Sequence, residues 1–124
     1  MKLIVCVDRN NGLAFNHRRQ SRDRAVTADI LAYAPVQIQE YSIKLFAGSP
    51  EKVKLCSDFP EEGVCFAERL PLPAAPETLI IYRWDRVYPA DEFLPYRLSE
   101  WKLCSSTELT GYSHERITKE IYTK

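Results

Sequence analysis

A proline-rich segment near the middle of the chain places the strictest limit on its fold. Pro71, Pro73 and Pro76 follow one another closely, and proline lacks the N–H group that a helix interior needs. They lie between two apolar runs, residues 64–67 and 78–84, which both predict short strands. A crossover between parallel strands takes a dozen or more residues and is usually helical. The chain must therefore join these strands without the usual helix.

Apolar runs elsewhere predict more short strands and one helix. The further strands are expected at residues 2–8, 36–40, 53–56, 101–105 and 115–123. Apolar residues recur at helical spacing between Ser21 and Pro35, so a helix is expected there, capped by Ser21 or Asp23. A short helical turn is expected at residues 42–47. The predicted fold class is α/β, with a mixed, mostly parallel sheet, few helices and one small domain spanning residues 1–124.

The composition is that of an ordinary globular protein with one core. The chain has 124 residues, of which 45% are hydrophobic and 27% are charged. No stretch approaches the roughly 20 apolar residues of a membrane span, and no signal-peptide pattern follows Met1, so a cytoplasmic location is expected. In that reducing compartment we expect free, buried thiols at all the cysteines, which are Cys6, Cys56, Cys65 and Cys104.

Basic residues gather near the start of a chain that has no net charge. Residues 1–24 contain six Lys or Arg and two Asp, a balance of +4, so residues 25–124 carry −4. Most of this excess lies in an arginine window, residues 18–24, which contains Arg18, Arg19, Arg22 and Arg24. If Ser21 caps the helix, their guanidinium groups surround the free N–H groups of the first turn.

Arginine side chains suit phosphate and carboxylate groups because they can donate two parallel hydrogen bonds. The arginine window and Ser21 therefore predict a site for a small anionic ligand. The alternative is a solvated loop whose arginines pair with Asp23 or with acidic residues elsewhere in the chain.

Motifs near both ends of the chain have a familiar order. Residues 3–8 (LIVCVD) followed by residues 10–13 (NNGL) resemble the first strand and flexible loop of dihydrofolate reductases. Residues 79–83 (LIIYR), 88–95 (YPADEFLP) and 99–103 (SEWKL) are similar to that family's late strand, acidic-aromatic-proline segment and following strand. The resemblance covers about half of the chain and implies a dihydrofolate reductase-like fold.

The segments that would hold that family's cofactor differ from its pattern. The family binds a phosphate of NADPH with a Gly-Arg-basic-Thr stretch, where this chain has residues 39–42 (QEYS), and Glu40 would repel that phosphate. The family also has a glycine pair that opens a helix at the pyrophosphate, where this chain has the proline-rich segment. NADPH is therefore disfavoured, and no other cofactor is predicted.

The resemblance gives two candidates for the family's catalytic carboxylate. Asp23 matches by spacing and Asp29 by its Ala-Asp-Ile-Leu context, although neither follows the family's Pro-Trp pair. Each also has a structural alternative, because Asp23 can complement the helix dipole and Asp29 can lie at a solvated helix position. Cys6 stands where small residues line the family's pterin cleft, or it packs as an ordinary strand residue.

Three other functions remain open beside the anionic ligand. RNA binding or processing would combine the arginine window with Phe15, Tyr33 and Tyr41 as stacking platforms, but the zero net charge argues against nucleic acid. A divergent reductase would take its proton from Asp23 or Asp29. A protein partner, with a homodimer as the economical case, would cover sheet surface that the missing helix leaves open.

Short chains that look like this one are sometimes identified as ribonuclease Z, and the residues do not support that assignment. The metal centre of that enzyme needs a dense cluster of His and Asp. This chain has two histidines, His17 and His114, each in a polar, loop-like stretch. No metal site is predicted.

Overall fold

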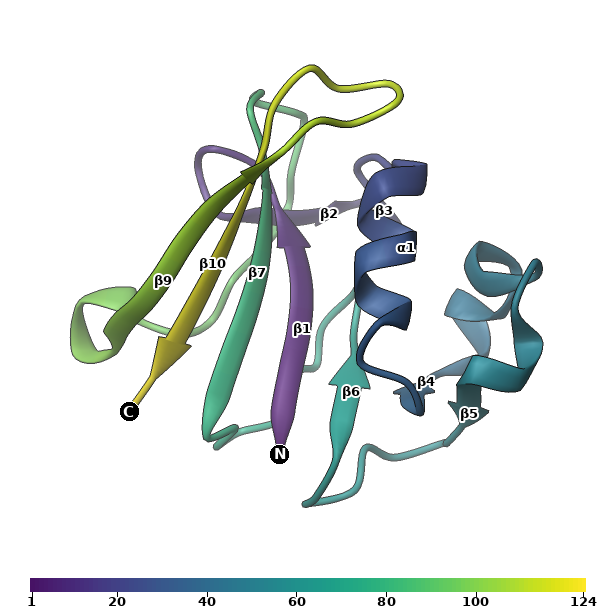
Figure 1. Ribbon diagram of the computed structural model, residues 1–124. Coiled ribbons are helices and arrows are strands. Elements are labelled where there is room, and N and C mark those ends of the chain that lie inside the picture. The colour runs from purple at the N-terminus through teal and green to yellow at the C-terminus, as the bar shows by residue number, and fades with distance from the viewer.

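The computed structural model describes residues 1–124 and is built around a seven-stranded sheet (Figure 1). The strand order is β5-β4-β6-β1-β7-β10-β9. Strands from β5 to β7 are parallel, whereas β10 is antiparallel to both of its neighbours. The bounds are β1 (Lys2–Val7), β4 (Val36–Ile38), β5 (Val53–Leu55), β6 (Val64–Phe66), β7 (Thr78–Trp84), β9 (Lys102–Leu109) and β10 (Ile117–Thr123). The predicted α/β class with a mixed, mostly parallel sheet is confirmed.

β1 lies in the middle of the sheet, between β6 and β7. Leu3, Ile4 and Val5 are fully buried, as expected for a strand whose two faces are both covered and whose sequence reads as a continuous apolar run. β1 pairs with β7 along its whole length, from Lys2 opposite Thr78 onward. The core of the molecule therefore lies on both sides of β1 and β7.

The two faces of the sheet are covered differently. The helix α1 (Arg24–Leu31) lies over one face (Figure 1), where Val26 and Ile30 join a buried cluster with Ile80 and Trp84. The other face is covered by segments outside the α-helix, which supply Phe59, Leu70, Leu72, Tyr96 and Leu98 to a second cluster. The 3₁₀ helices are η1 (Glu40–Phe46), η2 (Pro50–Lys52) and η3 (Leu98–Glu100). The sheet therefore has one α-helical face and one loop-covered face.

The proline-rich segment contains no helix, as its sequence predicts. Residues 67–77 cross from β6 to β7 in an extended path, and β1 lies between these two strands in the sheet. Two hydrogen bonds to residues outside the segment hold it in place. Leu70 N–H donates a 2.8 Å hydrogen bond to the Glu92 carboxylate, and the Tyr96 hydroxyl donates to the Pro73 carbonyl. The crossover is thus a tethered loop.

The first helix is capped by Asp23 and not by Ser21. The Asp23 carboxylate accepts a 2.9 Å hydrogen bond from Ala25 N–H, and the helix begins at Arg24. Of the two predicted caps, Asp23 is correct and Ser21 is wrong, so the arrangement of guanidinium groups around a first turn that follows Ser21 is wrong as well. A carboxylate satisfies the orphan N–H groups and also complements the helix dipole.

A second, three-stranded sheet was not predicted from the sequence. It has the order β3-β2-β8, formed by β2 (Gly12–Phe15), β3 (Arg18–Arg19) and β8 (Glu92–Phe93). The two residues between β2 and β3, Asn16 and His17, have φ of 50° and 58°. Positive φ at both central residues is typical of a two-residue hairpin turn. This turn fixes the direction in which the arginine window leaves β2.

No helix of the structure is long and apolar enough to cross a membrane. The four cysteines are free, as expected. The prediction that all are buried holds for Cys65 alone: Cys6 and Cys56 are half-buried, and Cys104 is exposed on the edge strand β9. An edge strand has one unpaired side, so a strand pattern alone does not imply burial.

Candidate functional site

The arginine window meets the loop between β9 and β10, residues 110–116, at the buried carboxylate of Asp23. The side chain of Asp23 is fully buried. It accepts six hydrogen bonds, from backbone N–H groups of Ala25, Tyr112, Ser113 and His114, from the Ser113 hydroxyl and from the His114 ring. Two segments about 90 positions apart are therefore joined at one carboxylate.

These hydrogen bonds keep Asp23 ionised. Burial alone would raise the pKa of its carboxyl group, but the bonds from backbone N–H groups and from His114 outweigh burial and hold the pKa well below the ordinary value. An ionised carboxylate only accepts hydrogen bonds. The Nδ1 of His114, 3.1 Å from Asp23 Oδ2, therefore carries a proton and donates it toward Asp23.

His114 is the centre of the network. Its side chain is 5% exposed, and its ring stacks on Trp84 with centroids 4.6 Å apart. Nε2 lies 3.0 Å from both the Ser21 and the Tyr88 hydroxyls, and in the neutral ring with its proton on Nδ1 it is an acceptor. The ring thus connects the buried Asp23 carboxylate to two hydroxyl groups.

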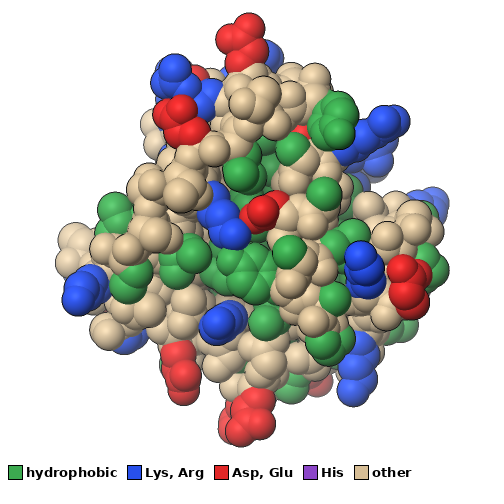
Figure 2. Space-filling model, viewed as in Figure 1, with side chains coloured by type: hydrophobic (Ala, Val, Ile, Leu, Met, Phe, Trp, Pro, Cys, Tyr) green, Lys and Arg blue, Asp and Glu red, His purple; other side chains and the backbone are tan.

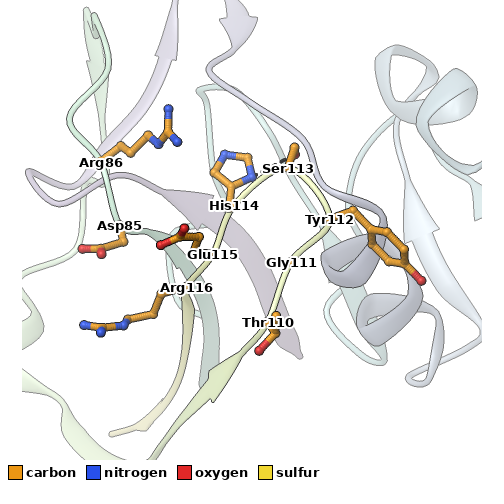
Figure 3. A pocket seen from close by; sticks show the side chains of 9 residues that line it. All are labelled: Asp85, Arg86, Thr110, Gly111, Tyr112, Ser113, His114, Glu115 and Arg116. Atoms are coloured by element: carbon orange, nitrogen blue, oxygen red, sulfur yellow. Dashed lines mark hydrogen bonds between the residues drawn. The ribbon is translucent and has the colours of Figure 1, made fainter.

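Cavities lie on both sides of the 110–116 loop. One of about 390 Å³ is lined by that loop together with Asp85 and Arg86 at the end of β7 (Figure 3). In Figure 3 the imidazole of His114 lies next to Ser113, and Tyr112 points away toward α1. The other, of about 430 Å³, lies between the loop and the start of α1, and its lining includes Arg22, Arg24 and Thr27.

The four arginines of the window have different surroundings and do not form one site. Arg19 forms a bidentate ion pair with Glu68, at 2.7 and 2.9 Å, and lies over the Tyr41 ring. Arg22 and Arg24 line the 430 Å³ cavity with no ion pair. Arg18 lines another cavity of about 530 Å³ beside the β2–β3 hairpin, with Phe15 and Tyr88 in its walls. The window therefore gives two exposed basic cavities and one internal ion pair.

Cys6 lies next to the Arg19–Glu68 pair. It lines a cavity of about 10 Å³ together with Ser21, Gln20 and Trp84, which is close to the smallest space that holds one water molecule. Burial, followed by the charge of Glu68, raises the pKa of the Cys6 thiol far above its ordinary value. Cys6 is therefore a protonated thiol in this structure.

Asp29 is part of a different cluster on α1. Its carboxylate accepts a hydrogen bond from the Tyr82 hydroxyl and lies 2.8 Å from Lys119 Nζ, which also stacks over the Tyr33 ring. Burial opposes the charge on Lys119, but its contacts with Asp29 and Tyr33 prevail and raise its pKa. Figure 2 shows a basic and an acidic side chain meeting in a hollow of this face, with hydrophobic side chains beneath. The pair links α1 to β10.

Sequence reasoning missed His114 and Tyr88. His114 was placed in a polar loop, yet it is buried and hydrogen-bonded on both ring nitrogens. No local signal marks this, because Ser21 and His114 are 93 positions apart. No group of three or more His, Cys, Asp or Glu side chains is arranged to hold a metal ion.

The network and fold can be compared with known proteins. No family model and no curated protein matches the chain. Among solved structures, the fold is similar to dihydrofolate reductase from Enterococcus faecalis, solved with NADP(H) and RAB-propyl. The TM-score is 0.64 and the sequence identity 10%, and the match covers 98% of this chain and 94% of that one. At this identity the likeness concerns the fold alone. The chain therefore has a dihydrofolate reductase-like fold with a divergent sequence.

Proposed function

We propose that the domain binds a small anionic ligand, bearing phosphate or carboxylate groups, in the 430 Å³ cavity at the start of α1. The observation that carries this proposal is the pair of arginines, Arg22 and Arg24, that line the cavity without any acidic partner. By contrast, Arg9, Arg19 and Arg83 are all paired with carboxylates.

The one acidic residue in the wall of this cavity is Asp23. Its side chain is fully buried, and all six of its hydrogen bonds come from the protein. Its negative charge is therefore largely compensated within the fold. A phosphate or carboxylate in the cavity would meet two guanidinium groups whose planar donors match its oxygens.

Anion binding predicts a rise in thermal midpoint. At a concentration of about 100 times the Kd, a ligand stabilises the folded state by about 2.7 kcal/mol. We expect inorganic phosphate or citrate to raise the midpoint of the wild type, measured by differential scanning fluorimetry at constant ionic strength. Arg22→Ala/Arg24→Ala should abolish the rise.

The matched control is Arg97→Ala/Lys102→Ala, which removes the same charge from two exposed positions elsewhere. It should retain the full rise. An equal response of both double variants would refute the site, and a response to single-stranded RNA that falls steeply with salt would favour the nucleic-acid alternative.

We also propose that NADPH is not the cofactor of this domain. Two features support this. Residues 67–77, which follow β6, contain no helix whose N–H groups could meet a pyrophosphate. Glu68 is instead held there by Arg19 and by the Ser42 hydroxyl. Beyond the end of β4, Glu40 is an exposed acidic residue at the start of η1.

Titration with NADPH should leave the fluorescence of Trp84 and Trp101 unchanged after correction for absorption, with N-acetyltryptophanamide as the reference. Both tryptophans are buried in the core that flanks β1 and β7, so binding in the fold would alter their surroundings. A saturable quench would instead support the divergent reductase, with Asp29 as the remaining candidate proton donor, because Asp23 is buried and ionised.

A protein partner is the second candidate function, and the edge strand β9 favours it. Seven of the eight residues of β9 are exposed, and the strand pairs only with β10. An exposed strand edge has free N–H and C=O groups that can pair with another chain. Leu103, half exposed at 50%, adds apolar surface. A second copy that pairs β9 with β9 would satisfy both edges.

This pairing predicts a concentration-dependent mass. Multi-angle light scattering should approach twice the 14.4 kDa of the single chain at high concentration. Leu103→Lys should restore the monomer, because a charge on an edge strand opposes edge pairing. Leu55→Lys, on the opposite edge strand β5, is the control and should leave the dimer intact. A monomer at every concentration would exclude the dimer.

A further inference from the structure

The buried histidine contacts a carboxylate on one nitrogen and a serine on the other. Asp23 Oδ2 lies 3.1 Å from His114 Nδ1, and His114 Nε2 lies 3.0 Å from Ser21 Oγ. An orienting carboxylate, a base and a hydroxyl in this order are the arrangement that activates a serine for attack on a carbonyl. We propose that Ser21 is the nucleophile of an acyl-transfer site that acts on carboxylic esters or thioesters, with His114 as base and Asp23 as its orienting group.

The histidine is held in the state that this role needs. Asp23 is ionised and accepts a hydrogen bond from Nδ1–H, so in the neutral ring the Nε2 lone pair faces the Ser21 and Tyr88 hydroxyls, each 3.0 Å away. Stacking on Trp84 fixes the plane of the ring. A base whose tautomer and orientation are fixed before substrate binds loses less entropy on the way to the transition state.

Ser21 is half-buried and lines the 10 Å³ cavity beside Cys6. Its neighbours in the chain line the larger cavities, Gln20 the one of 530 Å³ and Arg22 the one of 430 Å³. The backbone N–H groups of Ser21 and Arg22 donate no hydrogen bond within the protein. Backbone donors next to a nucleophile can stabilise the oxyanion that forms on the attacked carbonyl.

The chemical step balances without any added redox partner. The Ser21 Oγ–H proton moves to His114 Nε2 as Oγ bonds to the carbonyl carbon. The carbon–oxygen or carbon–sulfur bond to the leaving group then breaks, and Nε2 returns the proton to that group. Water then gives a proton to the same nitrogen and attacks the acyl–Ser21 ester. The bond from the acyl carbon to Oγ breaks, Nε2 returns the proton to Oγ, and the carboxylic acid is released.

The Tyr88 hydroxyl is the competing candidate, because it also lies 3.0 Å from Nε2. One lone pair accepts one strong hydrogen bond, so the two hydroxyls share it. Ser21 is assigned as the nucleophile because an aliphatic hydroxyl beside a general base is the established nucleophile of acyl transfer. Mapping of a covalent adduct separates the two residues directly.

The test uses neutral probes, so that its outcome does not depend on Arg22 or Arg24. Wild-type protein is incubated with an alkyl fluorophosphonate and its peptides are analysed by mass spectrometry. We expect one adduct, on Ser21, and none on Ser21→Ala. Ser106→Ala, at an exposed serine of β9, should be labelled like the wild type. Hydrolysis of p-nitrophenyl acetate should fall at least tenfold in Ser21→Ala and remain unchanged in Ser106→Ala.

Circular dichroism of Ser21→Ala checks that the variant remains folded, which is expected because the serine is only half-buried. His114→Gln should lose the adduct as well. An adduct on Tyr88, labelling of Ser21→Ala equal to that of the wild type, or no adduct at all would overturn the proposal.

Discussion

Replacing Asp23 by alanine is expected to lower the free energy of unfolding by about 3–5 kcal/mol, the usual cost of removing one partner from a buried charged network. The substitution leaves six donors without their acceptor, among them the buried ring of His114 and three N–H groups of the 110–116 loop. Each hydrogen bond to a charged group contributes about 1.5–3 kcal/mol. Urea unfolding followed by circular dichroism measures the loss.

The control is Asp58→Ala, an exposed aspartate whose replacement should change stability by less than about 0.5 kcal/mol. If Asp23→Ala were as stable as Asp58→Ala, the carboxylate would not be the joint between the arginine window and the 110–116 loop. A variant that fails to fold is consistent with the prediction and is detected by its circular dichroism spectrum.

The same carboxylate predicts a dependence on pH. The pKa of Asp23 in the folded chain lies below that of an aspartate in the unfolded chain, about 3.9. Its contribution is therefore fully present above about pH 4 and is lost as the pH falls toward the folded pKa. Wild-type stability should decline more steeply than that of Asp23→Asn between pH 5 and pH 2. Parallel slopes would contradict the assignment.

Replacing Gly111 by alanine is expected to destabilise the fold by about 2–3 kcal/mol, at the upper end of the cost of overpacking. A Cβ at this position would lie 2.5 Å from the His114 carbonyl oxygen, 2.6 Å from Asp23 Oδ2 and 2.9 Å from Ile117 Cδ1. The carbonyl is backbone and the carboxylate is held by six donors, so neither can move away cheaply.

Gly48 provides the matched control for this prediction. A Cβ there meets nothing within 4 Å, so Gly48→Ala should be neutral or should stabilise by a few tenths of a kcal/mol, because alanine restricts the unfolded chain. Both variants are compared by urea unfolding. Equal stability of the two variants would mean that the 110–116 loop can shift to accommodate the added methyl group at little cost in free energy.

Predictions from the sequence succeeded where burial and chain geometry act locally. The strand Thr78–Trp84 was predicted with its observed bounds because its apolar residues are continuous, and the proline-rich crossover was predicted to lack a helix. β9 was predicted to end at Ser105 and instead continues to Leu109. Residues 106–109 are held by hydrogen bonds to β10 and are mostly exposed, so their sequence has no hydrophobic pattern that would predict a strand.

The candidate site was less accessible to prediction because its parts come from distant segments. Arg19 was grouped with its neighbours in the sequence, but the turn of the β2–β3 hairpin directs its side chain to Glu68. His114 becomes a buried base only because β10 brings its loop beside α1. Neither contact is encoded in spacing along the chain, whereas the Asp23 helix cap is local and was among the predicted alternatives.

The position of β10 between β7 and β9 has a consequence for the order in which the fold can be completed during synthesis. Residues 117–123 supply the only sheet partner of β9 and one of the two partners of β7. Until these residues leave the ribosome, β7 has an unpaired edge and β9 has none of its hydrogen bonds to a sheet partner. The nascent chain should therefore bind chaperones until β10 emerges, and its release should coincide with that emergence.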